Sequence, residues 1–172
     1  SALKGSKVVK TQKNESLGFT EWTLANGIKV VIKQTPYQAD NIGVEAISDG
    51  GAAVFSDAEY NSAQLLGSVM SMSGISKFSA SDLRKQLSGK TAQASLGVSA
   101  YEHMVTANAA LKDVETMFQL LYLQFTAPRF SEDDFTTLMN RYNSLLANQT
   151  SNPDFIFSQN VQKSLYNDNY RR

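Results

Sequence analysis

The residues able to carry out chemistry are few in this chain, and none of them forms a recognised catalytic pattern. Among 172 residues there is one histidine, His103, and no cysteine. An imidazole-based zinc site needs more than one histidine, and a thiolate nucleophile or a disulfide needs cysteine. A Ser–His–Asp arrangement would depend on His103 alone, without a nucleophile-elbow motif. We therefore predict no catalytic, cofactor-binding or metal-binding residue in this chain, and we expect His103 in a solvated turn or an edge strand.

Two other groups of residues could do chemistry but have simpler structural interpretations. Asp57 and Glu59 could divide acid and base work, yet both fall in the first turn of a predicted helix, where carboxylates favour the helix dipole. Ser56 and Glu59 also have the spacing of a capping box. Gly50-Gly51 could shape a phosphate-binding loop, but no Gly-Lys-Ser/Thr ending follows it. We expect a strand-to-helix turn at these glycines.

Composition excludes several classes of function. Sixteen basic and sixteen acidic residues cancel, so the basic excess typical of nucleic-acid binders is missing. No apolar run approaches the roughly 18 residues that a membrane span needs. Residues 1–17 are polar and unpatterned and predict a linker, followed by one domain over residues 18–172. Because the chain starts Ser1-Ala2-Leu3, without methionine, we expect a piece of a longer protein. We also expect the domain to be truncated at its C-terminal end, at Arg172.

The elements that would position these residues occur in blocks. Asn26-Gly27 suits the tight turn of a β-hairpin. Apolar alternation predicts further strands, and helical periodicity predicts the helices. The expected strands are 19–24, 28–33, 42–46, 92–98 and 104–108. The expected helices are 56–73, a short one from Ser79 or Ser81 to Leu87, a fully buried one over Val114–Phe125, one opened by Ser131 and Asp134, and one opened by Asn152-Pro153. This order predicts an α+β fold, an antiparallel or mixed sheet with helices packed on one face.

Packing positions within these helices follow the helical period. In the first helix the inward residues should be Ala63, Leu66, Val69 and Met70. In the helix after Ser131 they should be Phe135, Leu138, Met139, Tyr142, Leu145 and Leu146, and in the last helix Phe157, Val161 and Leu165. The methionines Met70, Met72, Met117 and Met139 are expected to fill gaps in the core rather than to bind a metal or cofactor.

Four segments together resemble the insulinase/pitrilysin-type zinc peptidases, the inverzincins, and especially their large bacterial members. The four segments, in order, are Trp22-Thr23-Leu24-Ala25-Asn26-Gly27-Ile28-Lys29-Val30, Ser48-Asp49-Gly50-Gly51, Leu87-Ser88-Gly89-Lys90 and Gln119-Leu120-Leu121-Tyr122-Leu123-Gln124-Phe125-Thr126-Ala127-Pro128-Arg129. The resemblance covers residues 18–172. It implies the half-domain fold that these peptidases share with LuxS and the mitochondrial processing peptidase.

The resemblance also implies which part of such a peptidase this is. Active halves of the family carry His-x-x-Glu-His on the helix after the third strand, where the histidines bind zinc and the glutamate activates water. Here the corresponding residues 57–68 contain no histidine. The chain thus resembles a domain of the non-catalytic, C-terminal half, which forms a closed peptide-binding chamber opposite the zinc-bearing half. Zinc is expected in that other half, the partners are that half and a peptide substrate, and the implied compartment is the bacterial periplasm or cell envelope.

Two alternatives remain open. The scaffold could serve as a non-proteolytic structural or protein-binding module, as family-like subunits of respiratory complexes do. The chain could also be an unrelated enzyme, which would need a cleft with convergent polar groups. A His-x-x-Glu-His motif upstream in the parent protein, or in a partner encoded nearby, would favour the peptidase interpretation over the non-proteolytic module.

Overall fold

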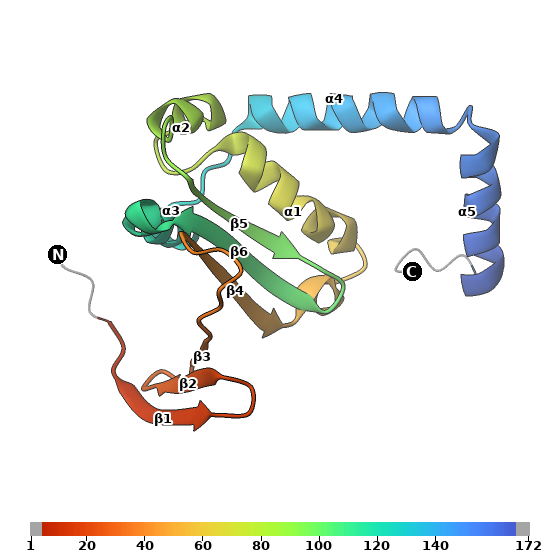
Figure 1. Ribbon diagram of the computed structural model, residues 1–172. Coiled ribbons are helices and arrows are strands. Elements are labelled where there is room, and N and C mark those ends of the chain that lie inside the picture. The colour runs from red at the N-terminus through yellow and green to blue at the C-terminus, as the bar shows by residue number, and fades with distance from the viewer. Residues whose placement is uncertain (1–4, 168–172) are drawn as a thin grey trace. The chain divides into compact units, whose positions relative to one another are not determined.

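The computed structural model describes residues 5–167, which form two compact units divided after Asp40 (Figure 1). The described part of the first unit has three strands, and the second unit has a second antiparallel sheet with five α-helices, so the predicted α+β class is confirmed. The elements are β1 Val8–Asn14, β2 Phe19–Leu24, β3 Lys29–Ile32, β4 Asn41–Asp49, the 3-10 helix η1 Gly51–Val54, α1 Tyr60–Ser73, α2 Ala80–Gln86, β5 Ala92–Val98, β6 Glu102–Ala110, the 3-10 helix η2 Leu111–Asp113, α3 Val114–Thr126, α4 Glu132–Gln149 and α5 Pro153–Tyr166.

The first unit is a three-stranded antiparallel sheet in the order β1-β2-β3. The predicted hairpin is its second and third strands, closed by a turn in which Gly27 has φ +87° and its N–H donates to the Leu24 carbonyl at 2.9 Å. Residues 8–14 supply the first strand, paired with β2 from Val8 to Asn14. The prediction that residues 1–17 form only a linker is therefore wrong for β1.

The second unit contains a separate antiparallel sheet in the order β4-β6-β5. We expected the hairpin to share one sheet with the strands near residues 42–48 and 91–108. That expectation is wrong within residues 5–167, because the hairpin forms a sheet with β1, and β3 is an edge strand that pairs with β2 and not with β4, β5 or β6. The two later strands pair as predicted, with Ala94 opposite Ala107 and Leu96 opposite Val105.

The core of the second unit lies on one face of this sheet. Ala107, Ala109 and Met117 are buried together, with Ala94 packed against them. A second cluster joins Tyr60 and Ala63 of α1 to Val98 of β5. Ala94 and Val98 are an even number of residues apart on β5, so α1 and α3 cover the same face. Figure 1 shows α1 running beside β5. The predicted placement of helices on one face thus holds for these two helices.

Several side chains that we predicted to be buried are exposed. In α3, Met117 and Leu120 are buried, but Phe118 is 54% and Phe125 65% exposed, so α3 is not buried all round. Leu66 of α1 is 43% exposed, and among the residues expected inward on α4 only Leu138 is fully buried. Phe135, Met139 and Tyr142 are half-buried. Five more residues of α4 and α5 that we expected to face inward are exposed: Leu145, Leu146, Phe157, Val161 and Leu165.

The turn between β4 and η1 shows why two glycines stand together. Gly51 has φ +61°, and a Cβ there would lie 2.4 Å from the backbone N of Glu102. The Ala52 N–H donates to the Ser99 carbonyl at 2.8 Å, which binds this turn to the loop before β6. The backbones approach so closely that only glycine fits. The predicted strand-to-helix turn at these glycines is confirmed.

Candidate functional site

The N-terminus of α1 is where the family's zinc motif would lie, and here it holds a capping arrangement. The Glu59 carboxylate accepts hydrogen bonds from the Ser56 hydroxyl at 2.6 Å and from the Ser56 N–H at 3.2 Å. These two bonds, the hydroxyl first, lower the pKa of Glu59 from its ordinary value. A capping box has two bonds, and the one from the Ser56 N–H to the Glu59 carboxylate forms. The other is missing, because the Ser56 hydroxyl donates to Glu59 instead of accepting from a helix N–H. Glu59 is engaged at the helix start, which agrees with its predicted structural role.

His103 lies on the central strand of the second sheet. Its cross-strand neighbours are Ser48 on β4 and Val98 on β5. The imidazole is half-buried and packs over Gly50, where an added Cβ would lie only 2.7 Å from Cε1 of His103. The expectation of a turn or edge-strand position is wrong, because β6 is paired on both sides.

The residues present do not fit a zinc ion of the family's kind. Helix α1 carries no histidine, and His103 is on a strand instead. Within residues 5–167 there is no group of three or more His, Asp or Glu side chains that could hold a metal ion. The side chains of residues 5–167 therefore do not form a zinc site of the kind that these peptidases use.

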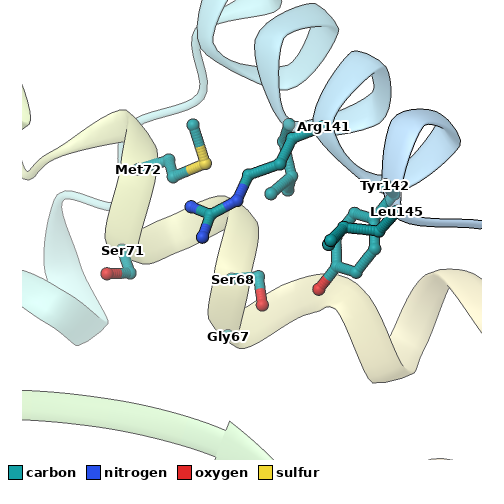
Figure 2. Close-up of a pocket in the computed structure, with 8 residues that line it drawn as sticks. Gly67, Ser68, Ser71, Met72, Arg141, Tyr142 and Leu145 are labelled. Carbon is teal, nitrogen blue, oxygen red and sulfur yellow. The ribbon is translucent and has the colours of Figure 1, made fainter. Parts of the chain in front are cut away.

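A cavity of about 430 Å³ lies between α1 and α4 (Figure 2). Arg141 and Tyr142 point from α4 toward α1, whereas the Ser71 hydroxyl points away from the guanidinium. Its lining residues are Gly67, Ser68, Ser71, Met72, Leu138, Arg141, Tyr142 and Leu145. We call this cavity the α1–α4 pocket.

Sequence reasoning placed Leu138, Tyr142 and Leu145 in a core and missed the polar part of the pocket. The signal available was Arg141, which is three residues after Leu138 and four before Leu145 and so shares their face of the helix. A smaller cavity of about 140 Å³ lies beside it, near Met70 and Leu96. Its lining has fewer polar groups that could orient a ligand, so the α1–α4 pocket is the stronger candidate.

Comparison with known proteins gives consistent relatives. No protein-family model matches the chain. In sequence it is 23% identical over 150 residues to "Probable zinc protease PqqL" of Escherichia coli K12, covering 87% of this chain and 16% of that protein. It is 24% identical over 155 residues to "Zinc protease PQQL-like" of Arabidopsis thaliana, covering 90% of this chain and 14% of that protein.

Solved structures agree with these relatives. The whole chain matches the crystal structure of the periplasmic protease PqqL from Escherichia coli with a TM-score of 0.82 and 21% identity, over 19% of that chain. It also matches a mutant of the ferredoxin protease FusC, solved in complex with Arabidopsis ferredoxin, with a TM-score of 0.78 and 21% identity, over 95% of this chain and 18% of that one.

These comparisons confirm the predicted resemblance to insulinase-type zinc proteases at the level of one domain. The chain has the fold of part of PqqL, a much larger protein. It spans 16% and 14% of the length of the two curated relatives and about a fifth of the two solved chains.

Proposed function

We propose that this chain is a non-catalytic domain of an insulinase-like zinc metallopeptidase, placed in the C-terminal half and forming part of the wall of a closed peptide-binding chamber. The observation that carries the proposal is a full-length structural match to part of PqqL combined with the helix α1, which lacks the histidines of the zinc motif. Zinc and the water-activating glutamate would then come from the other half of the parent protein or from a partner subunit.

The chemistry left to this domain is the shaping of the chamber. A wall that positions a peptide and excludes bulk water can remove several kcal/mol from a reaction barrier, in the range of about 1–5 kcal/mol for bound-state distortion alone. The partners we propose are the zinc-bearing half and a peptide substrate. We also propose a periplasmic compartment, supported by the periplasmic PqqL. No helix within residues 5–167 is both long enough and apolar enough to cross a bilayer.

Complementation of the two halves tests the proposal. The zinc-bearing half is assayed on a fluorogenic peptide alone, then with the complete second half, then with a second half from which this domain is deleted. We expect cleavage to require the complete second half and to fall steeply with the deletion. A zinc-bearing half without its motif glutamate provides the background control.

Two outcomes would contradict the proposal. Activity that depends on the second half but is unchanged by the deletion would remove the role of this domain and favour a non-proteolytic binding module. Chelator-sensitive cleavage by this chain alone, after removal of contaminating proteases, would show that it is catalytic.

A further inference from the structure

The α1–α4 pocket contains a cation that has no partner in the described part of the chain. Arg141 makes no hydrogen bond or ion pair with any residue among 5–167, and the same holds for the hydroxyls of Ser68, Ser71 and Tyr142. The guanidinium extends from α4 into the space that Ser68 and Ser71 border on α1 (Figure 2). One guanidinium and three hydroxyls therefore line the same cavity, and Arg141 is exposed there.

No carboxylate of the pocket lining supplies that acceptor, because the lining contains no Asp or Glu. The acidic residues of α4 lie in its first turn, away from Arg141, and one of them, Asp134, forms an ion pair with Arg129 at 3.5 Å. The charge of Arg141 is thus complementary to a ligand that is negative.

The apolar side of the pocket defines the rest of the ligand. Met72, Leu138 and Leu145 line it together with the polar groups, and Leu138 is buried. A carboxylate alone would leave these side chains uncovered in a cavity of about 430 Å³. Cavities of roughly 300–1,000 Å³ accept ligands with an apolar body and a few fixed polar contacts.

We propose that the α1–α4 pocket binds a peptide segment in which a Glu or Asp side chain is flanked by aliphatic residues. The carboxylate accepts two parallel hydrogen bonds from the guanidinium, the hydroxyls of Ser68 and Tyr142 donate to its two remaining lone pairs, and the aliphatic neighbour covers Met72 and Leu145. The single cation matches one negative charge. The pocket shares Gly67 and Ser68 with the segment that corresponds to the zinc motif, and the inference does not depend on the parent being a peptidase.

The test uses the full chain and two end-blocked peptides, acetyl-Ala-Leu-Glu-Leu-Ala-amide and its Gln counterpart. Titration of ¹⁵N-labelled protein follows the Nε–H signal of Arg141 and the amide signals of Ser68 and Ser71. We expect saturable shifts with the Glu peptide and about tenfold weaker binding of the Gln peptide, a factor equivalent to about 1.4 kcal/mol.

Three variants locate the binding. R141Q should weaken the Glu peptide about tenfold and leave the Gln peptide unchanged. R141K keeps the charge but loses the planar fork, so its affinity should fall between the two. R84Q on α2 removes the same charge outside the pocket and should change nothing.

Several results would overturn the inference. They are equal affinity for the Glu and Gln peptides, absence of saturable shifts at these three residues, unchanged binding by R141Q in a protein with a native spectrum, or tighter binding of inorganic phosphate than of the Glu peptide.

Discussion

Arg129, in the segment between α3 and α4, donates a hydrogen bond from its guanidinium to the backbone carbonyl of Ser73, the last residue of α1. Ser73 is fully buried, and its hydroxyl accepts from the Ser131 N–H at 3.3 Å. The Ser76 N–H donates to the Ala127 carbonyl at 2.9 Å nearby. These bonds connect the end of α1 to the segment that leads into α4. They therefore help to fix the angle at which the two helices cross beside the α1–α4 pocket.

Arg129→Met should therefore destabilise the fold by about 1–3 kcal/mol, because the buried Ser73 carbonyl loses a charged donor. Urea unfolding followed by circular dichroism measures the change. Asp134→Asn is the matched control, since it removes the ion pair with Arg129 but leaves the bond from Arg129 to Ser73. This partly exposed ion pair contributes at most about 1 kcal/mol. Equal losses in the two variants would show that the bond to Ser73 contributes little.

Leu138→Ala tests the contact between α4 and the rest of the second unit. Leu138 is 5% exposed, and removing a buried leucine side chain costs about 2–5 kcal/mol in free energy of unfolding. Leu146→Ala, on the same helix, changes a residue that is 52% exposed and should stay within about 0.5 kcal/mol of wild type. A small effect at Leu138 would mean that α4 does not pack there in solution.

Parts of this structure follow from local sequence, and others depend on distant contacts. The Asn26-Gly27 turn, the Ser131 cap that accepts from the Asp134 N–H, and the cap at Asn152 each result from neighbouring residues and were predicted correctly. Strand β1 was missed because six of its seven residues are exposed, so no buried face produces alternation. An edge strand of this kind is stabilised by backbone hydrogen bonds, and these do not require alternating apolar side chains in the sequence.

The errors in burial and in the candidate site have a similar cause. The apolar periodicity of α3 does not distinguish residues buried in the core from apolar residues left on the surface. It therefore could not predict that Phe118 and Phe125 are exposed in this domain. The α1–α4 pocket unites Ser68 with Arg141, which are far apart in sequence. Its geometry depends on how α4 crosses α1, and no local signal contains that information.

Gly51→Ala should be more destabilising than Gly89→Ala. Both residues have positive φ, +61° and +78°, so an alanine at either costs about 1–2 kcal/mol for a left-handed conformation. At Gly89 the new Cβ has open space within 4 Å, whereas at Gly51 it meets the backbone of Glu102 and Ser99 at 2.4 and 2.6 Å. Thermal unfolding of the two variants measures the difference. Similar melting temperatures would contradict the close approach at this turn.

Ser56→Ala should raise the pKa of Glu59 toward its ordinary value, because the hydroxyl bond is the largest cause of the lowering. A carboxyl whose pKa is lowered on folding stabilises the protein above its unfolded pKa, and that contribution is lost as the pH falls through the folded pKa. The variant should thus lose less stability on acidification over this range. Titration of the Glu59 side-chain ¹³C signal gives the pKa.

Ser79→Ala is the control for that experiment. The Ser79 hydroxyl donates to Asp82 at 2.7 Å and is the main cause of the lowered pKa of that carboxyl. The control should raise the pKa of Asp82 and leave Glu59 unchanged. An unaltered Glu59 pKa in Ser56→Ala would mean that the hydroxyl bond does not persist in solution.

The purified chain should bind no stoichiometric zinc. A zinc site of the insulinase type needs two imidazoles on one helix, and the single histidine is on β6, packed over Gly50. Elemental analysis after dialysis against zinc and then against buffer measures the metal retained. His103→Asn is the control for adventitious binding, because any weak surface zinc should depend on the one imidazole. About one zinc per chain that survives dialysis would contradict this interpretation, and retention in the His103→Asn variant would point to a carboxylate site instead.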